Sequence, residues 1–332
     1  MNSSWTSRAT LVFLLSAFGV PWTGWTLVNA LHPHHGTPLW WSLYLTGCFC
    51  SVAGFVATYV ESGWCGLRML LQRTLHVRFP ITWWLYAFFL FALGGIISTA
   101  IYGYAHGGIG PLKPLLLFTL FAPSSIFWLV TGPLGEEFGW RGYLLPRLLQ
   151  RYSPLTSALV LGLIWEVWHF PLYYRMFLHD FRDTARFTIE IMGLSLLVTV
   201  LFIHTGQSLA PVIALHWTAN VSMSAVHKVF PGIRATDAQD PYDMITMAAI
   251  TVLVVIIFMP ALRRHSLQLS EASPSWRAGS RPDVSYVTST RGTDEDSDSK
   301  CCLPNALIVL FSTLRSCSGG STNGFHVSNI SL

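Results

Sequence analysis

The chain has 332 residues, of which 52% are hydrophobic and 11% are charged, and its formal net charge is +4. Soluble domains carry about 25% charged residues, so this composition excludes an ordinary soluble domain and indicates a polytopic membrane protein. The same composition makes the lipid bilayer the expected surroundings. The sequence contains no basic run suited to nucleic acid, so we expect no nucleic-acid partner.

Runs without Asp, Glu, Lys or Arg mark the expected membrane-spanning helices. A helical crossing of a bilayer needs about 20 predominantly apolar residues, and four successive runs in the first half of the chain have roughly this length. They cover residues 9–31, 39–60, 81–104 and 115–135.

The second half of the chain continues the pattern with less regular runs. Residues 155–174 are apolar apart from Glu166 and His169 before Pro171. Residues 191–227 are too long for one helix, and the Thr-Gly-Gln-Ser sequence at 205–208 predicts a break that makes two. With a last run at 244–262, the expected fold is all-α, a polytopic membrane bundle of about eight transmembrane helices.

An even number of crossings places both termini on one side of the membrane. Basic residues are more numerous in the loops of that side, which the positive-inside rule assigns to the cytoplasm. From Ser266 the composition shifts to Ser, Thr, Arg and acidic residues, which predicts a disordered tail. The expected divisions are N-terminal helices at 1–114, a core at 115–227, a last loop and helix at 228–262, and a cytoplasmic tail at 263–332.

Three charged residues follow the fourth apolar run directly: Glu136, Glu137 and Arg141. A charged side chain at mid-membrane depth costs about 2.5–3.5 kcal/mol on insertion scales. On a helix Glu137 and Arg141 are i,i+4 neighbours and can pair, whereas Glu136 points roughly 100° away. The alternative is a cytoplasmic loop just outside the membrane, which Arg147 and Arg151 would fit.

Further polar residues lie in later apolar runs. Glu166 and His169 are spaced i,i+3, His216 and Asn220 are spaced i,i+4 on one helix face, and Glu190 is expected to open the sixth helix. Taken singly, a His or Asn in a membrane helix usually forms a hydrogen bond between helices.

Together, Glu136, His169, His216 and Asn220 come from three expected helices and can face one polar intramembrane cavity. A carboxylate and an imidazole can deprotonate a water molecule, either as general bases or as metal ligands. An amide or a second imidazole can then donate to the oxyanion that forms when this water attacks a peptide carbonyl.

Three motifs in this order resemble the CPBP family of intramembrane proteases, which includes type II CAAX prenyl endopeptidases and bacteriocin-immunity and abortive-infection proteins. The resemblance covers about residues 115–226. The motifs are Glu-Glu-x-x-x-Arg at 136–141, aromatic-x-x-x-His at 165–169 and His-x-x-x-Asn at 216–220, with the flanks Gly135, Gly142, Pro171, Ser208 and Pro211.

The resemblance implies an eight-helix membrane fold with a water-filled conical cavity. It implies that Glu136 and His169 activate the water, that His216 and Asn220 stabilise the oxyanion, and that Glu137 and Arg141 support the site. The family was first described as zinc metalloproteases, which would make Glu136, His169 and His216 the metal ligands. A metal-free glutamate mechanism is the competing interpretation, and both stay open at this point.

The implied substrate is a prenylated, CAAX-type or otherwise membrane-associated protein, cut near its C-terminus. The implied location is the endoplasmic reticulum membrane in a eukaryote or the plasma membrane in a bacterium. Two other classes of function fit the same polar residues. One is a proton- or cation-coupled transporter, and the other is a non-catalytic immunity or scaffold protein that keeps the cavity for binding.

Two positions depart from the family pattern. Trp165 stands where the family usually has Phe, a tolerable exchange if the ring only packs. Glu166 is an additional carboxylate beside His169, and it either faces away from the site or serves as a metal ligand.

Overall fold

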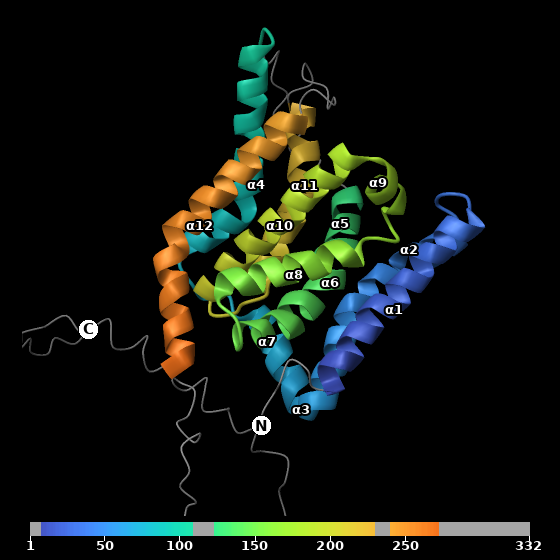
Figure 1. Ribbon diagram of the computed structural model, residues 1–332, viewed down its shortest axis with the longest axis vertical. Helices are drawn as coiled ribbons and strands as arrows, with labels where there is room; N and C mark the ends of the chain where they lie inside the picture. Colours follow the sequence, from blue (N-terminus) through green and yellow to red (C-terminus); the bar gives the residue numbers. More distant parts are fainter. Residues whose placement is uncertain (1–7, 109–122, 230–239, 272–332) are drawn as a thin grey trace, which may run out of the picture. The chain divides into compact units, whose positions relative to one another are not determined.

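The computed structural model describes residues 8–108, 123–229 and 240–271, and these residues form helices and no strand. The chain divides into two units, Met1–Leu269 and Ser270–Leu332, and the site lies within the first. In chain order the helices of Figure 1 are α1 Arg8–Leu31, α2 Pro38–Tyr44, η1 Leu45–Cys48, α3 Phe49–Leu75, α4 Ile81–Ala105, α5 Pro123–Leu129, η3 Val130–Leu134, α6 Gly135–Glu137, η4 Phe138–Leu144, α7 Leu145–Leu149, α8 Pro154–Trp168, α9 Tyr174–His179, α10 Phe181–His204, α11 Ala210–Val229 and α12 Asp240–Glu271. The all-α prediction is confirmed.

Five helical segments within the described ranges are long and apolar enough to cross a membrane. They are Arg8–Leu31, Pro38–Leu75, Ile81–Ala105, Phe181–His204 and Pro241–Phe258. Helix α8 is apolar but has only 15 residues. The expected count of eight crossings is therefore not confirmed, and the first part of the fourth expected run, from 115 to 122, lies outside the described residues.

Helix boundaries follow the sequence signals with two differences. The predicted break at 205–208 separates α10 from α11, and Gly206 and Gln207 both adopt positive φ there. Glu190, expected to open a helix, lies inside α10, because the Asp180 side chain caps this helix by accepting a hydrogen bond from the Asp183 N–H. Helix α12 continues to Glu271, past the predicted end at residue 262, and the rest of the expected tail lies outside the described residues.

Helix α3 packs closely against the segment that carries the two glutamates. A Cβ added at Gly139 of η4 would lie 2.5 Å from the Cys50 carbonyl oxygen of α3, so only glycine allows the two backbones to approach this far. At the other end of α3, the Arg73 guanidinium donates to the Gly142 carbonyl at 3.2 Å, and Glu61 pairs with Arg147. These contacts hold the glutamate segment against one helix along its length.

Hydrogen bonds from side chains to backbone carbonyls connect the other helices of the site. Ser195 of α10 donates to the Ala158 carbonyl of α8 at 2.8 Å. Thr218 of α11 donates to the Ala87 carbonyl of α4, also at 2.8 Å. Such bonds are a common way to join membrane helices, where burial of apolar surface gives little driving force. They keep α8 and α11, which carry the predicted imidazoles, at defined positions.

Candidate active site

The glutamate segment is a buried helix and not an exposed loop. Its turns at Val130–Leu134 and Phe138–Leu144 are π-helical, a geometry that is frequent at functional sites. Glu136 is 6% exposed, and Glu137 and Arg141 are fully buried. The stretch is therefore not an exposed loop, and its charges must be satisfied inside the protein.

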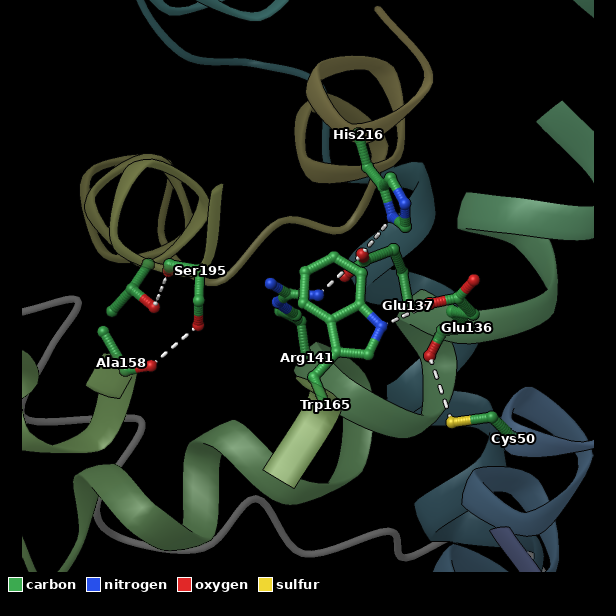
Figure 2. Close-up of polar contacts among 9 residues, drawn as sticks. Cys50, Glu136, Glu137, Arg141, Ala158, Trp165, Ser195 and His216 are labelled. Carbon is green, nitrogen blue, oxygen red and sulfur yellow. Dashed lines mark hydrogen bonds and ion pairs between the residues drawn. The ribbon is translucent and has the colours of Figure 1, made fainter. Parts of the chain in front are cut away.

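Glu137 forms the centre of a buried ionic network. Its Oε1 atom accepts a hydrogen bond from Arg141 Nη1 at 2.8 Å, as the i,i+4 spacing predicts. The same oxygen lies 2.6 Å from Nδ1 of His216, which comes from α11 (Figure 2). An ionised carboxylate can only accept, so Nδ1 carries the proton and Nε2 is left for the opposite side of the ring. Glu137 thus sets the orientation of His216.

Glu136 has a different partner from its neighbour. Its Oε2 atom accepts a hydrogen bond of 2.7 Å from the indole Nε1–H of Trp165 in α8. Figure 2 shows the second carboxylate oxygen turned away from the indole. From the sequence, Trp165 was considered a tolerable exchange for Phe on the condition that its ring only packs. The one available signal was that tryptophan, unlike phenylalanine, has an N–H to donate.

The four predicted catalytic side chains line one cavity of about 550 Å³. They reach it from α6, from the C-terminal end of α8 and from α11, and they are Glu136, His169, His216 and Asn220. Glu137 and Arg141 do not line it and lie behind it, which suits the supporting role predicted for them.

His169 caps the C-terminal end of α8. Its Nδ1 lies 2.8 Å from the Trp165 carbonyl oxygen, and because a carbonyl can only accept, Nδ1 is the protonated nitrogen. The ring stacks on Tyr173 at 5.8 Å between centroids and meets Phe187 edge-on at 5.3 Å. In the neutral ring, Nε2 therefore has a free lone pair.

His216 and Asn220 converge on a glycine that the sequence reasoning did not single out. A Cβ built at Gly132 of η3 would lie 2.6 Å from Asn220 Nδ2 and 3.8 Å from His216 Nε2. The missing side chain leaves space beside two possible hydrogen-bond donors, where a small oxygen atom fits. In the sequence, the only sign of a role for Gly132 in the site is its position one turn before the glutamates.

Glu166 does not belong to the cavity. Its carboxylate accepts a hydrogen bond from the Thr188 hydroxyl of α10, and Glu166 is not among the residues that line the cavity. Glu166 therefore faces away from the site, which was one of the two interpretations of this residue; the other was a metal ligand. Glu190, by contrast, does line the cavity wall.

The residues proposed as metal ligands do not form a metal site. Within the described parts of the chain, no three His, Cys, Asp or Glu side chains are grouped so that they could hold a metal ion. The three predicted ligands, Glu136, His169 and His216, do not make up such a group. The set Glu136, His169 and His216 does not fit a metal as it is arranged.

Comparison with known proteins agrees with the predicted family resemblance. Residues 118–222 match the family described as Rce1-like, type II CAAX prenyl endopeptidase. This match supports the CPBP family predicted from the sequence. The matched segment contains every predicted site residue. A CAAX prenyl protease 2 of Methanococcus maripaludis is 29% identical over 111 residues, which are 31% of this chain and 41% of that relative. The chain thus matches less than half of the relative's length.

Proposed function

We propose that this protein is an intramembrane endopeptidase that cuts a peptide bond near the C-terminus of a prenylated, CAAX-type protein or another membrane-associated protein. The observation that carries the proposal is the convergence of a carboxylate, two imidazoles and an amide on one cavity. These groups suffice to activate a water molecule and to stabilise a tetrahedral oxyanion.

Glu136 and His169 supply the first step. The free oxygen of the Glu136 carboxylate takes a proton from a water molecule, and the Nε2 lone pair of His169 accepts the second O–H and orients it. The oxygen of this water then bonds to the carbonyl carbon of the peptide. Both side chains are held by a hydrogen bond at their other polar atom, so their reactive atoms have a defined direction.

His216 and Asn220 supply the second step. The negative charge that develops on the carbonyl oxygen is placed in the space beside Gly132, next to Nε2 of His216 and Nδ2 of Asn220. Nδ1 of His216 already donates to Glu137, so donation from Nε2 requires the imidazolium, which carries a proton on both nitrogens. When the C–N bond breaks, the proton held by Glu136 passes to the leaving nitrogen.

The lining of the cavity suits a substrate with an apolar modification. Side chains from α10 and α12 contribute a wall that includes Met192, Leu196, Met247 and Val252. A prenyl group carries only hydrocarbon, so contact with such a wall costs no hydrogen bond. A divalent metal would polarise the attacking water if one were bound, but the side chains present do not fit one, and no step above depends on it.

The test is cleavage of a prenylated CAAX-type peptide in proteoliposomes, with mass analysis of both products. Glu136→Gln should abolish product, because an amide cannot accept the proton from water. Glu166→Gln is the matched control and should cleave like wild type, because Glu166 lies outside the cavity. Equal cleavage by Glu136→Gln and wild type would refute the mechanism. Wild-type protein that binds the peptide but never cleaves it would favour the scaffold interpretation.

A further inference from the structure

The side chain of Trp165 contacts three members of the site at once. Its indole N–H donates to Glu136, and its ring lies 4.4 Å from the Arg141 guanidinium carbon, measured to the ring centroid. The ring of His216 meets it edge-on at 5.1 Å. Trp165 is 2% exposed, so these contacts are shielded from bulk water.

Two of these contacts need only an aromatic ring, and one needs an N–H. The cation–π contact with Arg141 and the edge-on contact with His216 would survive replacement by phenylalanine, although more weakly. The hydrogen bond to Glu136 would not, because phenylalanine has no donor. The tryptophan at this position therefore adds one function to the site beyond packing, and that function concerns the general base directly.

Resting on the proposed function, we infer that Trp165 is a positioning residue, whose indole N–H holds one oxygen of the Glu136 carboxylate and so directs the other oxygen at the water. A carboxylate on a flexible side chain can otherwise rotate about its terminal bond, and either oxygen could face the cavity. The hydrogen bond selects one arrangement before substrate binds.

The surroundings of Trp165 are arranged to keep its N–H in place. The carbonyl of Trp165 accepts the hydrogen bond from Nδ1 of His169, so the same residue orients both members of the water-activating pair. Trp168 follows Trp165 by three positions on α8. Its indole N–H donates to the Ala17 carbonyl of α1 at 2.7 Å, and this hydrogen bond fixes the rotation of α8 about its axis. Trp165 thus connects Glu136 to His169 through a fixed helix end.

The decisive comparison is between two Trp→Phe variants. Trp165→Phe removes the donor to Glu136. Trp140→Phe is the matched control, because Trp140 is equally buried in the same core and its Nε1 has no hydrogen-bond partner among the described residues. With the prenylated peptide, we expect kcat of Trp165→Phe to fall by about 10–100-fold, the range for a hydrogen bond to a charged group, with KM within about twofold of wild type. Trp140→Phe should keep kcat within about twofold.

An isosteric variant separates the hydrogen bond from packing. Benzothienylalanine at position 165 keeps the shape of the indole and replaces the N–H by sulfur. The positioning role predicts the same loss of kcat as Trp165→Phe with an unchanged thermal unfolding midpoint. Wild-type kcat in this variant would overturn the inference, as would equal losses in the position-140 and position-165 Phe variants.

A measurement without substrate distinguishes failure of the inference from failure of the proposed function. In protein labelled with ¹⁵N-tryptophan, the indole N–H resonance of Trp165, assigned through its absence in Trp165→Phe, should shift in Glu136→Gln, while the Trp140 resonance stays in place. An unmoved Trp165 resonance would refute the hydrogen bond. Absence of peptide cleavage by wild-type protein with a shifted resonance would refute the endopeptidase proposal and keep Trp165 as the residue that orients Glu136.

Discussion

Replacing Gly132 by alanine tests the oxyanion site without substituting any proposed catalytic residue. The new Cβ would lie 2.6 Å from Nδ2 of Asn220, well inside van der Waals contact, and 3.8 Å from Nε2 of His216, which is ordinary contact. The clashing atom is the tip of a flexible side chain, so Asn220 can rotate away and the fold is retained. The methyl group then occupies the space meant for the oxyanion.

The expected magnitude follows from losing one oxyanion donor. Removing such a donor typically lowers kcat by about 10²–10³-fold, so we expect a loss of this size in Gly132→Ala with little change in KM. In thermal unfolding the variant should stay close to wild type, because alanine favours a helix over glycine by roughly 0.5–1 kcal/mol and offsets part of the strain.

The assay is single-turnover cleavage of the prenylated peptide, with Gly19→Ala as the control. A Cβ at Gly19 of α1 meets no atom within 4 Å, so this variant should cleave like wild type. The double variant Gly132→Ala with Asn220→Ala should be no worse than either single change, because both remove the same donor. Wild-type kcat in Gly132→Ala, or additive losses in the double variant, would refute the reasoning.

Three further outcomes check other parts of the structure. Glu137→Gln leaves the fully buried Arg141 without its charged partner and should destabilise the protein by about 3–5 kcal/mol, seen as a lower unfolding midpoint in detergent; Glu61→Gln at the more exposed pair should cost about 1 kcal/mol or less. Gly139→Ala drives a methyl group against the Cys50 carbonyl and should abolish the monodisperse peak in size-exclusion chromatography, whereas recovery at wild-type yield would contradict the close approach of α3. Treatment with a zinc chelator should leave kcat unchanged, and a loss restored by added zinc would show that a metal takes part.

The local parts of the site could be predicted from the sequence. The Glu137–Arg141 contact follows from i,i+4 spacing, and His216 and Asn220 share a face of α11 for the same reason. The expectation that polar groups in apolar runs face a common interior follows from the cost of charge in lipid, and the structure brings Glu136 and the others to one cavity. Their catalytic roles stay predictions.

The contacts between distant segments could not be predicted. Nothing in the spacing indicates that Glu137 meets His216, 79 positions away, or that Trp165 donates to Glu136, because both pairs depend on how α8 and α11 pack. Periodicity rules also assume 3.6 residues per turn, and the π-helical turns around Glu136 shift the directions of the side chains. The start of α10 was missed because charged residues such as Arg182 fall inside that helix.

The contact of Gly139 with Cys50 also limits where this protein can move. The two backbones are so close that any shift bringing a side chain between them would cause a clash. We therefore expect the wall that bears the glutamates to stay in a fixed position. Helix α12, on another wall of the cavity, meets its neighbours through rotatable side chains such as Thr251 beside Gly193. If the protein takes the lipidated substrate proposed above, we expect the α12 wall to move when the substrate enters, while the glutamate wall keeps the reacting groups aligned.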